Sequence, residues 1–236
     1  MKGLRAGGGM IDNNIQKARA DNVVSNKYGF GAYLYDPVLH FFLLFVGGAP
    51  EWRSSFIKLI NPLPGEKIAE LCCGTGAVSL KISKAINGKV WACDMAPDQI
   101  RVAAFKSKLL GADVEFSVQE ASGTSYPTAF FDRVIISGAL HEIKRGRRIA
   151  IYDEARRLLK TDGLFCVSEP VLPEKGWGRF CFKVFFGRWN PEHDTACELT
   201  GNGLENELYE AGFQKNKSRE SNFRMFRSSV FRKARG

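Results

Sequence analysis

The sequence predicts an α/β protein with a doubly wound, mostly parallel sheet of seven strands and a helical N-terminal cap. Strand-like and helix-like stretches alternate from residue 67 onward, and this alternation is typical of βαβ units. The chain has 236 residues, of which 44% are hydrophobic, and this is enough to bury one large core. Its longest apolar run, Phe41 to Val46, falls far short of the roughly 20 residues that a membrane-spanning helix needs.

The central elements follow one another regularly. Strands are predicted at 67–71, 89–94, 113–119, 131–137 and 163–169, and helices at 77–85, 97–110 and 147–159. Pro97 fits the first position of its helix, and Gly111 ends it. Right-handed crossovers between such strands give a parallel sheet that is covered by helices on both faces.

The two ends of the chain have a different character. Residues 1–20 are Gly-rich and polar, and they predict a mobile tail. An aromatic, apolar stretch follows and predicts helices packed beside the core, interrupted by a turn at 47–50. After a helix at 203–211, two strands at 213–219 and 226–231 predict a closing antiparallel hairpin.

Cysteine and histidine usage excludes several classes of protein. The six cysteines include no C-x-x-C pair, and there are only three histidines, so no zinc site or disulfide framework is expected. The N-terminus lacks the apolar segment of a secretory signal. We therefore expect free thiols in the reducing cytoplasm.

Most of the net charge of +9 lies after Gly212. The cations there are Lys215, Lys217, Arg219, Arg224, Arg227, Arg232, Lys233 and Arg235, and Glu220 is the one acid. Such a stretch suits nucleic acid or an anionic membrane surface. It equally suits a solvated edge hairpin whose cations discourage strand pairing with other molecules.

The first strand leads into a glycine loop, Gly74-Thr75-Gly76, ahead of a helix. Two close glycines allow a ligand to approach the backbone. A dinucleotide-binding loop would carry a third glycine where this chain has Ser79. Glu70, at the end of the strand, would repel a pyrophosphate but suits a cationic amino group.

Two further acids follow the next strands. Asp94 ends the second strand and can accept both ribose hydroxyls of a nucleoside. Glu120 follows the third strand and can accept a hydrogen bond from an adenine amino group. Contacts to an amino acid, a ribose and an adenine, in that order, describe S-adenosyl-L-methionine.

On these residues the chain resembles the class I S-adenosylmethionine-dependent methyltransferases, which have a Rossmann-like fold. The four landmarks are the stretches 70–76, 94–95, 120–121 and 131–137, and Cys72 stands where that family often has glycine. The resemblance implies a cofactor site and S-adenosyl-L-homocysteine as a product. The implied cofactor-binding residues are Glu70, Cys72, Cys73, Gly74, Thr75, Gly76, Asp94, Met95, Glu120, Ala121, Ser137 and Gly138.

The resemblance also divides the chain. We expect a single methyltransferase domain over 21–236, with a helical cap at 21–62 and a cofactor-binding core at 63–169. An aromatic substrate cap is expected at 170–203, and the last helix and closing strands at 204–236.

His141 is the candidate catalytic residue, because it follows the fourth strand on the side where the methyl group would lie. A neutral imidazole can act as a base near physiological pH when the acceptor must lose a proton. A structural role in fixing the loop remains the alternative. Glu142 is expected to face solvent or to pair with Lys144 or Arg145.

Aromatic segments outside the core predict an apolar acceptor. Candidate substrate-binding residues are Tyr35, Trp177, Phe182 and Phe186, although the same rings would also serve as core. Tyr35-Asp36, Gly47-Gly48 and Glu51-Trp52-Arg53 look similar to the ubiquinone/menaquinone-biosynthesis C-methyltransferases, which methylate quinol rings. The stretch 137–142 departs from that subfamily. We expect a small, apolar, ring-bearing substrate.

Alternatives from other classes stay open. One is a phospholipid methylase at the membrane surface, to which the basic tail would bind. Another is an RNA methyltransferase, although the Pro-Pro-aromatic and Pro-Cys motifs of base methylases are absent. A module that binds the cofactor without catalysis is the third. Nucleic acid is disfavoured as a partner, and peripheral contact with a membrane is retained.

Overall fold

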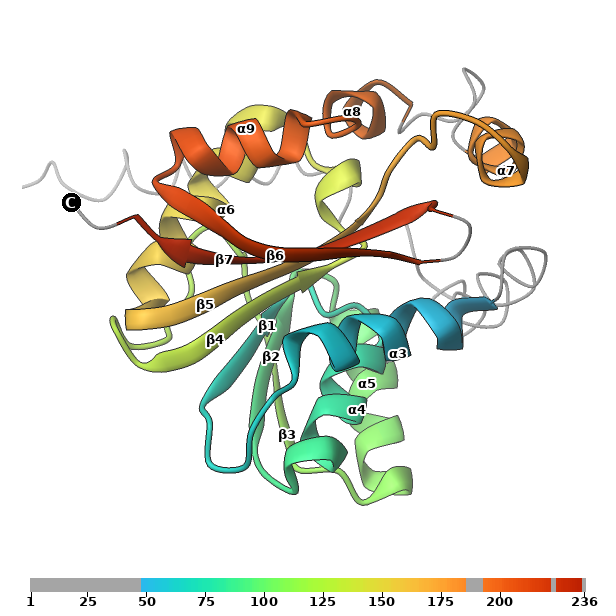
Figure 1. Ribbon diagram of the computed structural model, residues 1–236. Coiled ribbons are helices and arrows are strands. Elements are labelled where there is room, and N and C mark those ends of the chain that lie inside the picture. The colour runs from blue at the N-terminus through green and yellow to red at the C-terminus, as the bar shows by residue number, and fades with distance from the viewer. Residues whose placement is uncertain (1–47, 186–192, 222–223, 235–236) are drawn as a thin grey trace, which may run out of the picture.

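A seven-stranded sheet runs through the computed structural model, which describes residues 48–185, 193–221 and 224–234 (Figure 1). The strand order is β3-β2-β1-β4-β5-β7-β6. The strands are β1 (Ile68–Leu71), β2 (Val90–Asp94), β3 (Val114–Val118), β4 (Phe131–Ser137), β5 (Leu159–Pro170), β6 (Phe213–Ser221) and β7 (Phe226–Lys233). The predicted tail at 1–20 and most of the predicted cap at 21–62 lie outside the described residues.

The sheet is mixed rather than purely parallel. Strands β1 to β5 pair in parallel, as the alternation of strands and helices predicts. Strand β7 is antiparallel to both of its neighbours, β5 and β6, and forms the predicted hairpin with β6. The order changes direction at β1, because chain connections run from β1 out to β3 and then back to β4. Open α/β sheets bind ligands at such a point.

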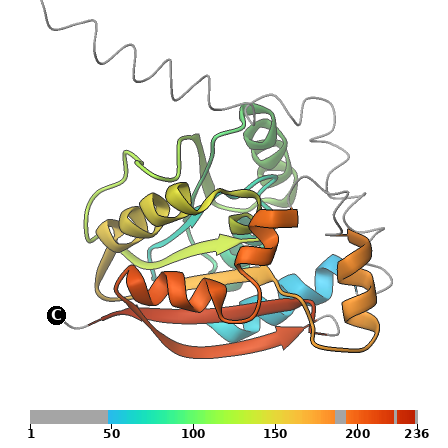
Figure 2. The same ribbon diagram turned by 90° about the horizontal axis from the view of Figure 1, so that it is seen from above.

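Helices cover both faces of the sheet (Figures 1 and 2). One face carries α3 (Gly48–Ile60), α4 (Ala77–Ile86) and α5 (Pro97–Leu110), and the other carries α6 (Arg145–Leu158) and α9 (Gly203–Glu210). The 3₁₀ turn η3 (Leu140–Glu142) follows β4. Helices α7 (Trp177–Phe185) and α8 (His193–Glu198) come between β5 and α9.

Each face has its own core. Between the sheet and α3 and α4, the fully buried side chains include Phe56, Ile82 and Ile135. On the opposite face, Tyr152 of α6 packs edge-on against Phe165 of β5, which in turn contacts Phe213 of β6. Burial of apolar residues of the central strands β1, β4 and β5 on both faces explains why these runs read as short continuous strands in the sequence.

Element limits differ from the prediction in a few places. The predicted turn at 47–50 is wrong from Gly48 onward, because α3 begins there and its first turn tolerates proline. Strand β5 begins at Leu159, directly after α6, rather than at Gly163. Helices α7 and α8 lie in a stretch for which the sequence predicted no helix.

The basic hairpin lies at the edge of the sheet. Most side chains of β6 are exposed, and β6 has no neighbour on its outer side. Lys215 pairs with Glu205 at 2.6 Å, and Arg227 pairs with Glu220 at 3.2 Å. This position agrees with the interpretation of the basic stretch as an edge hairpin whose cations discourage strand pairing with other molecules. All six cysteines are free, and within the described part of the chain no helix is long and apolar enough to span a membrane.

Candidate functional site

One cavity of about 900 Å³ opens at the carboxyl ends of β1, β2 and β4. Its size suits a small-molecule ligand, for which cavities of about 300 to 1,000 Å³ are usual. We call the part built on the strand ends the strand-end wall: Glu70, Cys72, Cys73, Gly74, Thr75, Asp94, Met95, Glu120 and Ala121. We call a second group of lining residues, which come from α3, from the segment after β4 and from α6, the outer wall: Trp52, Ala139, Glu142, Ile143, Lys144 and Ile151.

Glu70 ends β1 and is buried at the strand-end wall. Its carboxylate accepts hydrogen bonds from the backbone N–H of Ser79 at 2.8 Å, from the Ser79 hydroxyl, and from Ser137 Oγ at 2.9 Å. Burial away from water raises the pKa of Glu70 to about 7, and the serine hydrogen bonds offset only part of that rise. A cationic ligand group at this wall would favour the ionised carboxylate.

Asp94 at the end of β2 is held by two backbone amides. Oδ2 accepts from Gly74 N at 2.8 Å, and Oδ1 accepts from Ala96 N at 2.9 Å. Burial raises the pKa of Asp94 above its ordinary value. A carboxylate has about four acceptor positions, so both oxygens retain capacity for hydroxyl groups of a ligand.

The two glycines of the loop have different surroundings. Gly74 lines the cavity with φ +54°, and a Cβ there would meet no protein atom closer than 4.0 Å. Gly76 does not line the cavity, although the sequence placed it in the cofactor site. A Cβ on Gly76 would lie 2.7 Å from the ring of Phe116, so this glycine lets the loop approach β3.

Two further polar side chains that line the cavity can accept hydrogen bonds from a ligand. Glu120 accepts a hydrogen bond from Arg147 at 2.8 Å and lines the cavity after β3. Gln99 of α5 was not predicted from the sequence, and its buried Oε1 has no hydrogen-bond partner. A buried acceptor of this kind suits a donor on a ligand.

Trp52 of α3 forms the apolar side of the outer wall. Its Nε1 donates to Ser168 Oγ at 2.7 Å, and its ring stacks on Phe226 with centroids 4.5 Å apart. Gly138 lines the cavity beside it, and a Cβ there would come within 2.9 Å of the indole. The packing of three distant elements therefore fixes this ring.

His141 lies behind the cavity rather than among its lining residues. Its Nδ1 is 2.8 Å from Oε2 of Glu169, a fully buried carboxylate at the end of β5. Glu169 also accepts the backbone N–H groups of Ala139 and Leu140, each at 3.0 Å. Nε2 of His141 lies 3.9 Å from Oε1 of Glu142, and Glu142 does line the cavity.

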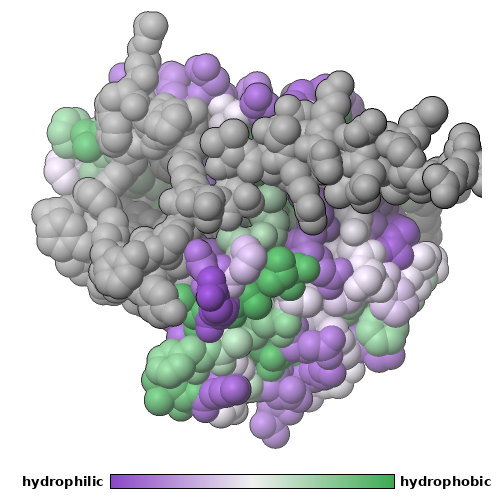
Figure 3. Space-filling model, turned by 180° about the vertical axis from the view of Figure 1, so that it is seen from behind, coloured by the Kyte–Doolittle hydropathy of each residue, from purple (hydrophilic) through white to green (hydrophobic). Residues whose placement is uncertain are grey.

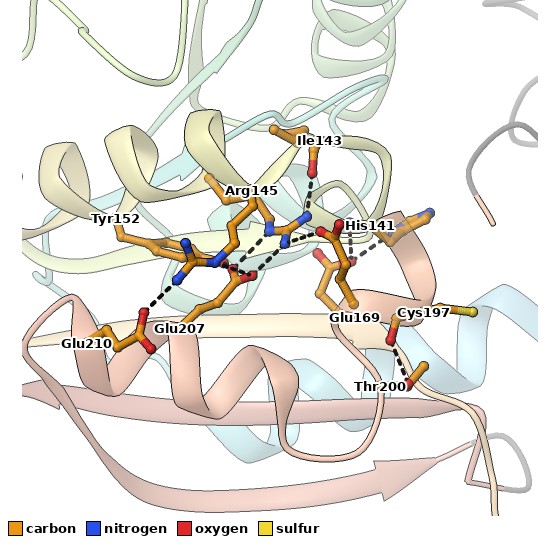
Figure 4. A network of polar contacts seen from close by, with 11 residues as sticks. His141, Ile143, Arg145, Tyr152, Glu169, Cys197, Thr200, Glu207 and Glu210 are labelled. Carbon is orange, nitrogen blue, oxygen red and sulfur yellow. Dashed lines mark hydrogen bonds and ion pairs between the residues drawn. The ribbon is translucent and has the colours of Figure 1, made fainter. Parts of the chain in front are cut away.

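A buried arginine joins the outer wall to α8 and α9, and Figure 4 shows its partners Ile143 and Glu207. Arg148 of α6 is fully buried and donates to Glu207 through Nε at 2.9 Å and Nη2 at 2.5 Å. Nη2 also reaches Glu198 of α8 at 2.8 Å, and Nη1 donates to the carbonyl of Ile143 at 2.5 Å. Helices α6, α8 and α9 are thus joined to a residue of the outer wall.

Two of the four predicted substrate residues fall within the described part of the chain, and neither of them lines the cavity. Tyr35 and Phe186 lie outside the described residues. Phe182 is buried with Trp52, Cys181 and Phe226, and Trp177 stacks on Phe180 at the surface with centroids 5.3 Å apart. Neither Phe182 nor Trp177 lines the cavity.

The residues present fit S-adenosyl-L-methionine. Three carboxylates line the cavity at the ends of successive strands, Met95 lies between two of them in the sequence, and Gln99 Oε1 lacks a donor. Every predicted cofactor residue except Gly76 lines this cavity, so the structure brings the set together. Among the described side chains, no cluster of His, Cys, Asp and Glu is arranged for a metal ion.

The comparisons with known proteins point the same way. A family model described as "Methyltransferase domain" matches residues 68–163. The demethylmenaquinone methyltransferase of Staphylococcus saprophyticus is 25% identical over 179 residues, which cover 75% of this chain and 73% of that protein. The demethylmenaquinone methyltransferase of Thermus thermophilus is 29% identical over 154 residues, which cover 63% of this chain and 67% of that protein.

Among solved structures, a methyltransferase dependent on S-adenosylmethionine from Aquifex aeolicus superimposes with a TM-score of 0.62. The match covers 76% of this chain and 88% of that one, with 17% identity. At this identity the likeness shows the fold, and the matched fold is the Rossmann-like one that the four landmarks predict.

Proposed function

Because this chain is an S-adenosylmethionine-dependent methyltransferase, we propose that its methyl acceptor is a small, apolar, ring-bearing molecule of the quinol type. The proposal rests on the outer wall, because its residues Trp52, Ile143 and Ile151 add apolar side chains to the lining of the cavity. The two relatives named as demethylmenaquinone methyltransferases support the same substrate class.

In this proposal the strand-end wall holds the cofactor, which supplies an electrophilic methyl group on a sulfonium. Glu70 faces the amino-acid portion, Asp94 accepts the ribose hydroxyls, and Glu120 with Ala121 borders the adenine. Gly74 leaves room for the ligand beside the backbone. The chain's main contribution to the rate is alignment and exclusion of water, because methyl transfer is an in-line displacement.

Glu142 is the proposed general base. A quinol becomes a better carbon nucleophile when its hydroxyl loses a proton, and the Glu142 carboxylate lines the cavity to accept it. Behind it, Nδ1 of His141 lies 2.8 Å from Oε2 of the buried Glu169, and Nε2 lies 3.9 Å from Oε1 of Glu142. His141 is then a positioning residue beside the base.

The substrate class is tested by incubating the full chain with S-adenosyl-L-methionine and a short-chain naphthoquinol kept reduced. We expect a singly methylated ring by mass spectrometry and an equal amount of S-adenosyl-L-homocysteine. Parallel reactions contain phosphatidylethanolamine vesicles or RNA as acceptor. Methylation of either one, with the quinol unchanged, would replace the quinol proposal by the corresponding alternative.

The base is tested by Glu142→Gln and His141→Ala. We expect Glu142→Gln to lower kcat by about 10²-fold and to remove the acidic limb of the pH profile, because a positioned base contributes about that much. His141→Ala should lower kcat by roughly tenfold, with an unchanged affinity for the cofactor. Glu115→Gln, an exposed glutamate of β3, serves as the matched control. A fully active Glu142→Gln enzyme beside an inactive His141→Ala enzyme would make His141 the base instead.

A further inference from the structure

Helix α7 is apolar on both of its faces. Cys181 and Phe182 are 5% and 2% exposed and point into the protein, where they pack with Trp52 and Phe226. On the outer face, Trp177, Phe180 and Val184 are 50%, 58% and 47% exposed. A helix at the surface of a soluble protein normally presents polar groups outward, so this outer face suits a further partner.

Cations surround the outer face of α7. Lys175 and Lys183 are exposed on either side of the aromatic pair, and Arg179 is half-buried. Arg224, at the tip of the basic hairpin, interacts electrostatically with Glu174 just before the helix. Seen from behind, the end of the molecule where α7 lies shows green apolar side chains (Figure 3). Aromatic rings within a basic rim match the composition of helices that lie in a membrane interface.

The position of α7 connects this face with the cavity. The helix follows the carboxyl end of β5, which is the side of the sheet on which the cavity opens, and lies beyond the strand ends (Figure 2). Its inner residue Phe182 packs in the same cluster as Trp52 of the outer wall. A surface docked on the outer face would therefore lie one side-chain layer away from the wall proposed to hold the acceptor.

We propose that the outer face of α7 docks the enzyme on an anionic membrane surface, next to the cavity. Trp177 and Phe180 enter the interfacial layer, and Lys175, Lys183 and Arg224 contact anionic headgroups. A second copy of this chain fits less well, because it would place the same cations opposite one another. The inference rests on the proposed function, since an apolar acceptor dissolves in the bilayer and would reach the outer wall from there.

Co-sedimentation with vesicles tests the docking without cofactor or acceptor. The vesicles contain phosphatidylcholine with phosphatidylglycerol, and a second set contains phosphatidylcholine alone. We expect the full chain to bind the anionic vesicles, and Trp177→Ser/Phe180→Ser to weaken that binding by about tenfold or more, because two interfacial rings are removed. Lys175→Glu/Lys183→Glu should weaken it by a similar factor and should flatten its salt dependence.

A matched pair on α5 is the control. Phe105 and Leu109 are 65% and 74% exposed at the far end of the sheet, where Figure 3 also shows apolar side chains. Phe105→Ser/Leu109→Ser should leave vesicle binding unchanged. Equal loss in both double variants, or no binding of the unaltered chain to anionic vesicles, would overturn the docking proposal.

Methylation separates this proposal from the substrate proposal. The α7 double variant should retain its activity on a water-soluble short-chain quinol and lose activity on a long-chain quinol in anionic vesicles. If the unaltered chain binds vesicles but methylates no quinol, the docking surface stands and the substrate proposal fails. If it methylates soluble quinol but binds no vesicle, the docking proposal fails and the substrate proposal stands.

Discussion

The two walls of the cavity are built in different ways. The strand-end wall is formed by residues at or just beyond the carboxyl ends of adjacent parallel strands, so that Glu70, Asp94 and Glu120 come together whenever the sheet forms. The outer wall depends on contacts between segments far apart in the chain. Trp52 is held by Ser168 and Phe226, and the backbone at Ile143 is held by Arg148.

The topology of the sheet fixes the strand-end wall, whereas the outer wall depends on how distant segments pack. A ligand at the strand-end wall meets positions that the Rossmann-like topology fixes through backbone hydrogen bonds, such as those from Gly74 and Ala96 to Asp94. A ligand at the outer wall meets side chains whose positions depend on buried polar partners. Proteins that share this sheet can therefore bind the same ligand at the strand-end wall while the residues of the outer wall differ.

Replacing Arg148 gives the largest effect and tests the outer wall. Arg148→Met leaves the buried carboxylate of Glu207 with only the Tyr152 hydroxyl and the more distant Arg145, so we expect a loss of about 3 to 5 kcal/mol in the free energy of unfolding. The KM for the acceptor should rise more than the Kd for S-adenosyl-L-methionine, because the Ile143 carbonyl loses its donor. Urea titration measures the free energy of unfolding, steady-state kinetics measure the KM, and calorimetry measures the Kd.

Arg145→Met is the control for that measurement. Its guanidinium is about half exposed, pairs with Glu210 at 2.6 Å and lies 3.7 Å from Glu207, so the loss should stay within about 1 kcal/mol. Arg148→Met/Glu207→Met should recover most of the stability lost in the single variant. Similar losses for Arg145→Met and Arg148→Met would show that the burial of Arg148 does not add to the free energy of unfolding.

Asp94→Ala gives the next largest effect and tests the strand-end wall. Loss of the acceptor for two ribose hydroxyls should weaken cofactor binding by about 100-fold, since each hydrogen bond to a charged group contributes about 1.5 kcal/mol. Asp98→Ala, on the next helix, should bind the cofactor normally. Because Asp94 also fixes Gly74, circular dichroism and Asp94→Asn check that the loop stays folded. Unchanged affinity in Asp94→Ala would exclude this wall as the ribose site.

The strand-end wall was largely predictable from the sequence. A carboxylate after a strand and glycines before a helix are local patterns, and the parallel topology places them together without knowledge of packing. Gly76 shows the limit of this reasoning, because the motif does not distinguish a glycine beside a ligand from one beside Phe116. Gln99 was missed because it lies inside a helix that otherwise reads as an ordinary amphipathic one.

The outer wall was not predictable in the same way. The sequence indicates that 170–203 is aromatic, but the direction of each ring depends on how α7 packs against Trp52 and Phe226. Trp177 and Phe182 therefore share a helix and have opposite surroundings. The pairing of His141 with Glu169 joins residues on two strand ends that are adjacent in space and 28 positions apart in the chain. No local pattern marks such a pair.

Glu70→Gln gives the smallest effect and tests whether the strand-end wall favours a positively charged ligand. The pKa of Glu70 is about 7 in the folded chain against an ordinary value of 4.5, so the folded state holds more protons between these pH values. Stability from this group is therefore greatest at low pH and falls as pH rises from about 4.5 to about 7. Glu70→Gln should remove this decline, which thermal unfolding across the same range measures.

Cofactor affinity should change in the opposite direction. A cationic ligand prefers the ionised carboxylate, so S-adenosyl-L-methionine should bind up to about tenfold more tightly at about pH 8 than at about pH 6. The increase should be smaller for S-adenosyl-L-homocysteine, which lacks the sulfonium charge, and absent in Glu70→Gln. Glu115→Gln should keep the full dependence. A pH dependence that survives in Glu70→Gln would assign it to Asp94, whose pKa burial also raises, and would place charge recognition at the end of β2 rather than β1.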